Sequence, residues 1–173
     1  MADDPDRRGF LKVATCALGG GLGIVLAAPA LRLISDPVGK TTVTTPTDPI
    51  DLGPVDRFRS DAPIKVEVLA PLLKDAWTTA RDVVLGGAWI QQQANKQLVA
   101  YSAVCPHLGC GIGFEGGTYV CPCHDSKFAA GTGDRLSGPS KRGLDPLPLE
   151  VVNGRLRLTW IAYQMDTADR EKA

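Results

Sequence analysis

The sequence predicts an all-β head domain of antiparallel strands, preceded by one N-terminal transmembrane helix. Short apolar runs with a two-residue period recur from residue 64 onward, which is typical of strands with one buried face. The 19 glycines and 13 prolines among 173 residues indicate many turns between short strands. A stretch of 19 uncharged residues precedes this region and predicts the helix. The length suits one ordinary domain with an appendage.

Residues 1–12 resemble an export signal. The paired arginines Arg7 and Arg8 are followed by Gly-Phe-Leu-Lys, an order similar to the twin-arginine signal of bacteria. Two arginines before an apolar run are also ordinary flanking charge, and the Phe-Leu-Lys that follows favours the export signal. We therefore expect a cytoplasmic twin-arginine signal region at residues 1–12.

A transmembrane anchor is predicted at residues 13–34. No charged residue lies between Lys12 and Arg32, and a helix of that length rises about 29 Å, close to the hydrocarbon thickness of a bilayer. The apolar regions of cleaved signals are shorter, at about 7 to 15 residues. Residues 28–30, Ala-Pro-Ala, nevertheless resemble a cleavage site, so length is what favours a retained anchor. The basic residues before the span place the N-terminus in the cytoplasm and the head in the periplasm.

Residues 35–54 form the predicted tether. They contain four prolines and five threonines without an apolar period, a composition that gives an extended, semi-rigid chain. Composition alone supports a plain spacer equally well. The head domain is then expected at residues 55–163, and the polar residues 164–173 are expected to fray.

The head domain combines a base of strands with a small lobe of loops. Five segments carry the strand pattern: Ile64–Val68, Val83–Ile90, Leu98–Ser102, Leu147–Val152 and Arg155–Ile161. The last two flank Asn153-Gly154, a strong signal for a two-residue hairpin. The loops between about residues 104 and 143 are expected to form the lobe, mounted on this base.

The residues that can bind a metal lie between Cys105 and His124. These twenty positions hold four of the five cysteines and both histidines of the chain. Each half offers a Cys and a His at short range, in the motifs Cys-Pro-His-Leu-Gly-Cys and Cys-Pro-Cys-His-Asp-Ser. Thiolate and imidazole together suit zinc, or an iron–sulfur centre in which two His replace two Cys on one iron.

The two motifs resemble the cluster-binding loops of Rieske iron–sulfur proteins, and more narrowly those of the Rieske subunits of cytochrome bc-type quinol:cytochrome c oxidoreductases. The resemblance implies a Rieske-type antiparallel head with a small cluster-binding lobe and one Rieske-type [2Fe-2S] cluster per chain. The implied ligands are Cys105 and Cys121 on one iron, and His107 and His124 on the other. The resemblance also implies a disulfide between Cys110 and Cys123 that ties the loops together, which requires an oxidising compartment.

The same resemblance assigns residues around the cluster. Ser126 would donate its hydroxyl hydrogen to a cluster sulfide. Phe128 stands where the respiratory proteins usually have a tyrosine that bonds a ligand cysteine, so this donor is missing. Gly138 and Pro139 resemble the start of a third loop that covers the cluster and commonly reads Gly-Pro-Ala-Pro. Lys-Arg at residues 141–142 departs from that pattern, which predicts a looser cover and altered docking.

The resemblance implies an electron-transfer subunit of a quinol:cytochrome c oxidoreductase in the bacterial cytoplasmic membrane, with a single span. Its cluster would take one electron from quinol, while His124 as the catalytic residue takes a proton, and would pass the electron to a c-type cytochrome. A b-type cytochrome subunit that binds quinol is the other expected partner. Loss of the tyrosine hydrogen bond would lower the potential of the cluster, which matches menaquinol rather than ubiquinol. In this family the tether is a hinge that lets the head swing between partners.

Several alternatives use the same residues. A Cys2His2 zinc site, as in a non-redox scaffold module, leaves two cysteines without a role. A Rieske-type oxygenase needs two further His for a mononuclear iron, and no His remains. The small Rieske subunit of an arsenite-oxidase-like molybdoenzyme also pairs a twin-arginine signal with this centre, and can have Phe at the place of Phe128. With 19 basic and 19 acidic residues, no basic excess indicates nucleic acid.

Overall fold

The computed structural model describes residues 5–40, 42, 46, 48–75 and 77–173. Residues 1–4 of the predicted signal region and residues 41, 43–45 and 47 of the predicted tether lie outside the described residues. The chain divides into two compact units, Met1–Thr42 with Lys74–Thr78 and Val43–Leu73 with Thr79–Ala173.

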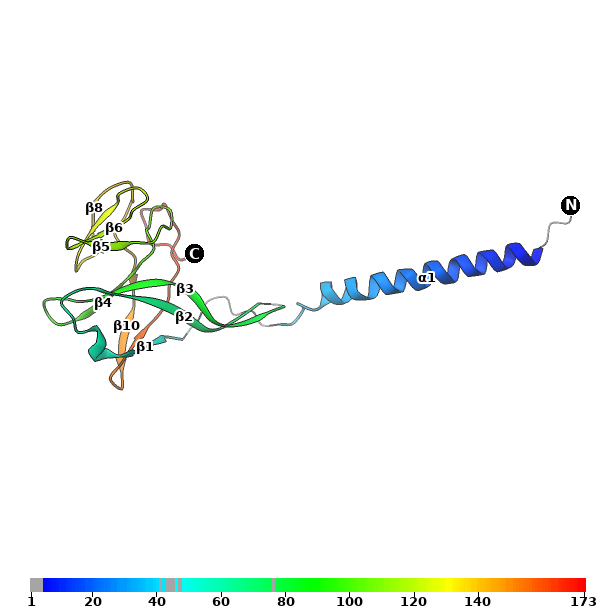
Figure 1. The fold of residues 1–173 in the computed structure, drawn as a ribbon, viewed down its shortest axis with the longest axis horizontal. Coiled ribbons are helices and arrows are strands. Elements are labelled where there is room, and N and C mark those ends of the chain that lie inside the picture. The colour runs from blue at the N-terminus through cyan, green and yellow to red at the C-terminus, as the bar shows by residue number, and fades with distance from the viewer. Residues whose placement is uncertain (1–4, 41, 43–45, 47, 76) are drawn as a thin grey trace. The chain divides into compact units, whose positions relative to one another are not determined.

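A single long helix, α1, comprises Pro5–Ser35 (Figure 1). From Asp6 to Ser35 the helix is long enough and apolar enough to cross a membrane. It begins before the predicted anchor because the Arg, Leu and Lys residues of that region are good helix formers. The predicted anchor at residues 13–34 is therefore helical throughout.

The base of the head contains a three-stranded antiparallel sheet with the order β1-β11-β10. Its strands are β1 at Ile50–Pro54, β10 at Leu149–Val152 and β11 at Arg155–Leu158. The hairpin predicted at Asn153-Gly154 joins β10 to β11 and is confirmed. The strand β1 occupies the end of the predicted tether, because residues 50–54 pair with β11 instead of remaining extended and unpaired. A short 3-10 helix, η1 at Val55–Phe58, follows β1.

A four-stranded sheet with the order β2-β3-β4-β9 completes the base. Its strands are β2 at Ile64–Lys74, β3 at Thr79–Gln92, β4 at Leu98–Ser102 and β9 at Pro146–Leu147. Both β2 and β3 extend beyond the predicted segments, while β4 has the predicted bounds. The segment predicted as one strand at residues 147–152 is divided at Pro148, which has no N–H to continue a ladder.

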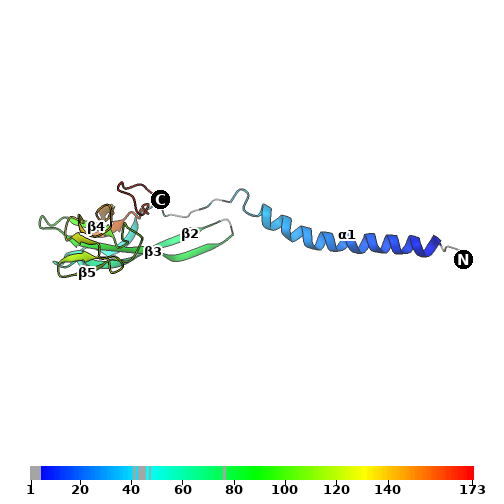
Figure 2. The same ribbon diagram turned by 90° about the horizontal axis from the view of Figure 1, so that it is seen from above.

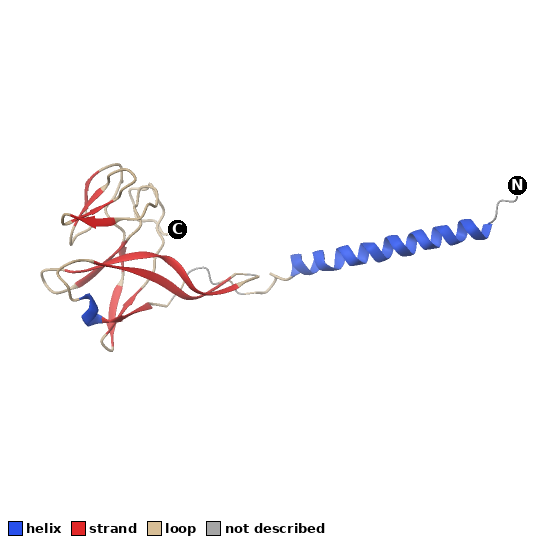
Figure 3. Ribbon diagram, in the orientation of Figure 1, coloured by secondary structure: helices blue, strands red, loops and turns tan. Residues whose placement is uncertain are grey.

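The lobe contains a four-stranded antiparallel sheet with the order β5-β6-β7-β8. Its strands are β5 at Gly113–Glu115, β6 at Thr118–Val120, β7 at Lys127–Ala129 and β8 at Arg135–Ser137. Most of the lobe outside these short strands is loop (Figure 3). Figures 1 and 2 show the lobe strands beside β3 and β4. The predicted all-β head with a small lobe is confirmed.

Strands β3 and β4 contribute to both cores of the head. They pair so that Trp89 lies opposite Tyr101 and Ile90 lies opposite Ala100. Because successive strand residues point to opposite faces, Ile90 and Ala100 lie in the core of the base, whereas Trp89 and Tyr101 lie in the core of the lobe.

The C-terminal residues differ from the expectation of a frayed tail. Tyr163 and Lys172 form an antiparallel bridge, and the Gln164 N–H donates to the Glu171 carbonyl at 2.8 Å. The polar composition of this segment predicted no packing partner, but its backbone groups find partners in the fold.

Candidate metal centre

Two loops of the lobe close in the same way. The Cys105 N–H donates to the Cys110 carbonyl at 2.8 Å, and the Cys121 N–H donates to the Ser126 carbonyl at 2.9 Å. In each loop a backbone hydrogen bond therefore joins the first residue to the residue five positions later. The first residue of each loop is a cysteine that belongs to the lobe core. The two Cys-containing turns therefore share the same backbone closure.

The two loops carry the four predicted metal ligands, one Cys and one His each. Cys105 and Cys121 are each 1% exposed. The rings of His107 and His124 meet edge to face, with centroids 4.9 Å apart. Both thiols are thus on the buried side of the site, while His124 is exposed and His107 is half-buried.

A disulfide joins the two loops, as the resemblance implied. Cys110 and Cys123 are bonded with an S–S distance of 2.14 Å. Their sulfurs and that of Cys121 lie within 4.8 Å of one another. Sulfurs held in a disulfide do not offer thiolates, so the thiols that can bind a metal here are Cys121 and Cys105.

The donor atoms fit an iron–sulfur centre in two respects. Nδ1 of His107 is buried and has no hydrogen-bond partner, which is unfavourable unless a metal accepts its lone pair. Burial raises the pKa of the Cys105 thiol, and the backbone N–H of His107 lowers it by a smaller amount. A buried thiolate therefore needs a cation beside it. Two thiols and two imidazoles match the ligand set of a Rieske-type [2Fe-2S] cluster.

Ser126 is held against the third loop by a close backbone approach. Its hydroxyl oxygen accepts the N–H of Ser140 at 3.2 Å, which leaves the hydroxyl hydrogen available to a further acceptor. A Cβ at Gly138 would lie 2.4 Å from Cα of Ser126, and Gly138 has φ +91°. Glycine is therefore required there, because any side chain would push the third loop away from Ser126. Pro139 is the residue between these two contacts.

Phe128 is fully buried on β7, in the same core as Cys105 and Cys121. Its ring has no donor. The tyrosine hydroxyls of this core donate elsewhere: Tyr119 to Oε1 of Gln91 at 3.0 Å and Tyr101 to the Gly131 carbonyl at 2.7 Å. Neither hydroxyl therefore replaces the tyrosine that is missing at position 128.

Sequence reasoning missed the polar network that supports the lobe. Oε1 of Gln91 accepts both the Tyr119 hydroxyl and the Gly131 N–H, the latter at 2.9 Å. Burial raises the pKa of Tyr119, so its hydroxyl remains a donor. The two-residue period of β3 was the available signal, because it places Gln91 on the same face as Trp89.

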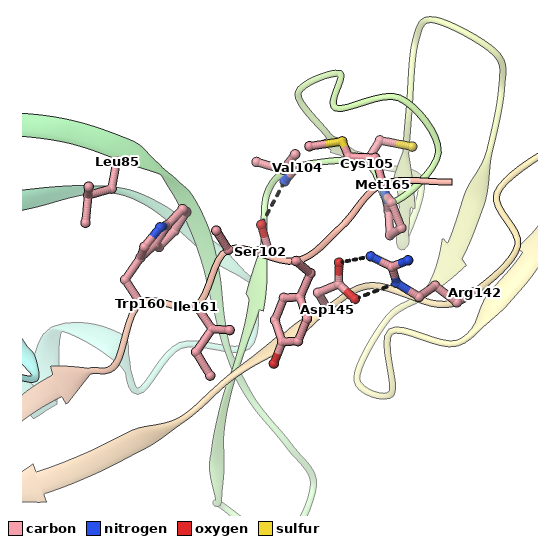
Figure 4. Close-up of a pocket in the computed structure, with 12 residues that line it drawn as sticks. Leu85, Ser102, Val104, Cys105, Arg142, Asp145, Trp160, Ile161 and Met165 are labelled. Atoms are coloured by element: carbon pink, nitrogen blue, oxygen red, sulfur yellow. Dashed lines mark hydrogen bonds and ion pairs between the residues drawn. The ribbon is translucent and has the colours of Figure 1, made fainter. Parts of the chain in front are cut away.

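The position of Arg142 corrects the expectation that the basic pair at residues 141–142 alters docking. It is 6% exposed and pairs with the 5% exposed Asp145, Nε to Oδ1 at 2.8 Å and Nη2 to Oδ2 at 2.8 Å. The hydrogen bonds with Asp145 raise the pKa of Arg142. Arg142 is thus an internal residue rather than a docking residue. Arg142 and Asp145 line an apolar pocket of about 170 Å³ that Cys105 also lines; Figure 4 shows these residues.

Comparison with known proteins supports a Rieske-type domain in this chain. The family model of the Rieske [2Fe-2S] domain matches residues 72–148. The chain is 28% identical over 160 residues to the menaquinol:cytochrome c reductase iron-sulfur subunit of Geobacillus thermodenitrificans, covering 88% of this chain and 89% of the relative. It is 30% identical over 168 residues to the ubiquinol-cytochrome c reductase iron-sulfur subunit of Blastochloris viridis, covering 88% and 92%.

Among solved structures, the plasma membrane Rieske protein of Synechocystis PCC 6803 aligns over 64% of this chain and 99% of its own, at 24% identity and a TM-score of 0.47. The loops, their donors and the curated relatives define the class as an iron–sulfur protein with a Rieske-type [2Fe-2S] cluster. Within that class, the chain belongs to the family of Rieske iron–sulfur subunits of cytochrome bc-type complexes.

Proposed function

We propose that this chain is the electron-transfer subunit of a membrane quinol:cytochrome c oxidoreductase. The observation that supports the proposal is the pair of loops with the same backbone closure, each of which carries one buried thiol and one imidazole. The proposed ligands are Cys105, Cys121, His107 and His124. The two relatives compared above bear the names of menaquinol and ubiquinol reductase subunits.

The proposed site is divided between electron storage and proton binding. When bound, the cluster supplies a one-electron redox centre. His124 is exposed, so its ring is accessible to a quinol hydroxyl, and we assign to it the proton that leaves the quinol. His107 is half-buried and would contribute mainly to docking.

The quinol is proposed to be menaquinol, because of Phe128. A hydrogen bond to an anionic sulfur stabilises the reduced centre, and bonds to charged groups contribute about 1.5 to 3 kcal/mol. Its absence lowers a one-electron potential by about 100 mV. The backbone N–H groups of His107 and Leu108 act to lower the pKa of the Cys105 thiol, although burial raises it overall. Since the hydroxyls of Tyr101 and Tyr119 donate elsewhere, we expect the potential to match the lower potential of menaquinol.

The helix α1 supports a membrane anchor in this proposal. Its length and composition suit one span, and Arg7 and Lys12 on its N-terminal side favour a cytoplasmic N-terminus. The head would then lie in the periplasm, where the disulfide is stable. The twin-arginine pattern provides a route for a head that folds around its cluster before export. The proposed partners are a b-type cytochrome subunit and a c-type cytochrome.

Purification of the tagged chain from its membrane, with electron paramagnetic resonance and an inventory of subunits, tests this function. We expect a rhombic signal on reduction, co-purifying b-type haem and a midpoint potential below that of ubiquinol-linked relatives. A molybdopterin subunit in place of b-type haem would instead assign the chain to an arsenite-oxidase-like enzyme. A single zinc without a signal would refute an electron-transfer role. A midpoint as high as that of ubiquinol-linked relatives would refute the menaquinol assignment.

A further inference from the structure

Three loops surround the candidate metal centre: the first ligand loop at residues 105–110, the second ligand loop at residues 121–126, and the third loop, which begins at Gly138. The C-terminal segment 164–167 contacts the first and the third. It accepts hydrogen bonds from a side chain of the third loop and donates one to the backbone of the first. None of these contacts is needed to close a sheet. We call residues 164–167 the strap.

Arg142 binds the strap with all of its donors in use. Besides the two bonds to Asp145, its Nη1 donates to the carbonyl of Thr167 at 2.8 Å and to Oγ1 of Thr167 at 2.7 Å. Its Nη2 donates to the Gln164 carbonyl at 2.7 Å. A guanidinium has five N–H groups, and these five bonds use each of them. Such a saturated, buried guanidinium fixes the strap in one position.

Lys141 adds a second contact from the third loop. Its Nζ donates to the Asp166 carbonyl at 2.8 Å and lies 3.1 Å from Oδ2 of the same residue. This ion pair is half-exposed on both sides, so it contributes less than the buried pair of Arg142. Both residues of the basic pair at 141–142 therefore bind the strap.

The strap in turn holds the first ligand loop. The Asp166 N–H donates to the carbonyl of Pro106 at 2.9 Å, which is the peptide that leads directly into His107. The Met165 sulfur lies 3.0 Å from the position that a Cβ would take on Gly109, so the two residues are in close contact. Figure 4 shows Met165 next to Cys105, with the Arg142 pair below.

The second ligand loop is held differently. Ser126 accepts the Ser140 N–H, Gly138 packs on the Ser126 backbone, and the disulfide reaches Cys123. The strap bonds the first loop directly through Pro106 and reaches the second loop only through the third. A change in the strap should therefore act most strongly on the side of His107 and Cys105.

We propose that the strap is a positioning element for the first ligand loop, and that Arg142 is the positioning residue that seats it. The strap fixes the Pro106 peptide through the Asp166 N–H, and so sets the rate at which His107 and Cys105 lose their metal. This inference rests on the ligand assignment of the proposed function, but its test does not require quinol oxidation.

The test compares two substitutions at one position in the purified full-length chain. Asp166→Pro removes the N–H that bonds Pro106, and proline cannot adopt the φ of 55° found at Asp166. Asp166→Asn retains the N–H, tolerates that φ and removes only the charge. Lys172→Ala, an exposed tail change, is a second control. A chain ending at Tyr163 removes the strap together with residues 168–173, which include Arg170, an ion-pair partner of Asp145 at 3.5 Å.

The rate of metal loss to a chelator is measured together with hydrogen exchange and the midpoint potential. We expect Asp166→Pro and the shortened chain to lose the metal about two- to tenfold faster, the range that corresponds to one hydrogen bond. Amide exchange in residues 105–110 should rise in both, with exchange in β10 and β11 unchanged. Asp166→Asn and Lys172→Ala should stay within about twofold of the parent chain.

Parent-like metal loss and exchange in Asp166→Pro would overturn the inference, even if the shortened chain fails to fold. Slower quinol oxidation with unchanged metal loss and exchange would also overturn it, because the strap would then serve docking. Zinc in the parent chain would refute the proposed function instead. The ratio of metal loss between Asp166→Pro and Asp166→Asn would still decide the role of the strap.

Discussion

The base and the lobe of the head are stabilised in different ways. The base has strands of up to 14 residues, as in β3, and an apolar core that includes Val68, Ile90 and Leu156. The lobe has strands of three residues and a core of rings around Tyr119 and Phe128. The small lobe therefore depends on hydrogen bonds, a disulfide and a metal for stability that the base obtains from apolar burial.

Substitution of a ligand should remove the cluster from the lobe and leave the sheets of the base folded. We expect Cys121→Ser to abolish the bound cluster, because a buried hydroxyl does not replace a thiolate at iron. Iron content and visible absorbance measure the loss, and circular dichroism should still show the sheets of the base. Cys16→Ser is the matched control, since Cys16 lies in α1 as a free thiol. Retention of the cluster by the Cys121 variant would remove that residue from the ligand set.

A cavity in the base should have the opposite effect. Leu156 on β11 is fully buried, so Leu156→Ala should lower the free energy of unfolding by about 2 to 5 kcal/mol. Denaturant unfolding of the head measures this change. Cluster loss under native conditions should remain at the parent rate. Val151→Ala, at an exposed site on the neighbouring strand β10, should cost less than about 1 kcal/mol. Equal effects of the two changes would argue against the described core.

Removal of the disulfide should act on the lobe alone. Cys110 and Cys123 are 13 residues apart, and closing a loop of this length contributes about 3 kcal/mol in the chain-entropy description. The double change to serine should therefore speed cluster loss in the native protein, in contrast to Leu156→Ala. Chelator kinetics with and without a reductant provide the measurement. Indistinguishable kinetics would show that loop closure through Cys105 and Cys121 is sufficient.

A single hydroxyl in the lobe core should alter the potential rather than the stability. Phe128→Tyr should raise the midpoint potential by about 100 mV, because a donor to a ligand sulfur favours the reduced state by about 1.5 to 3 kcal/mol. Redox titration of the purified chain tests this change. Phe114→Tyr adds a hydroxyl to a half-buried ring on β5 and should leave the potential unchanged. An unaltered midpoint in the Phe128 variant would mean that another donor already compensates.

The smallest effect is expected at an ion pair of the base. The hydrogen bond from Arg155, at 2.6 Å, lowers the pKa of Asp51 below its usual 3.8. A lowered carboxyl pKa gives stability that is present above the unfolded value and is lost as the pH falls through the folded value. Asp51→Asn should therefore flatten the pH dependence of unfolding below about pH 4. Acid titrations of both chains, followed by circular dichroism, measure the difference, and parallel curves would contradict it.

The sequence predicted the regular parts of this fold well. Leu98–Ser102 has the same bounds as predicted because its pattern ends directly at the first ligand loop, and Asn153-Gly154 defined its hairpin by local turn chemistry. The strands of the lobe were missed, since three residues are too few to show a two-residue period. The strand β1 was hidden in a proline-rich segment, because its pairing with β11 is a long-range contact.

The sequence alone predicts candidate ligands for the site but not the residues that support them. Two Cys and two His in paired motifs remain the predicted donors. The role of Gln91 depends on a partner 28 residues away, the hydroxyl of Tyr119. The role of Arg142 depends on backbone carbonyls of the strap, 22 and 25 residues further along the chain. The two-residue period of β3 places Gln91 on the lobe face, but local sequence does not identify the distant partners of Gln91 or Arg142.

The pairing of β3 with β4 makes the two halves of the head interdependent. Alternate residues of these strands serve different cores, with Ile90 on one side and Trp89 on the other. A shift of the strands by one position would exchange every inward and outward side chain, so both cores would be lost together. Global unfolding of the head should therefore occur as one cooperative transition, although the loops at its end can open on their own.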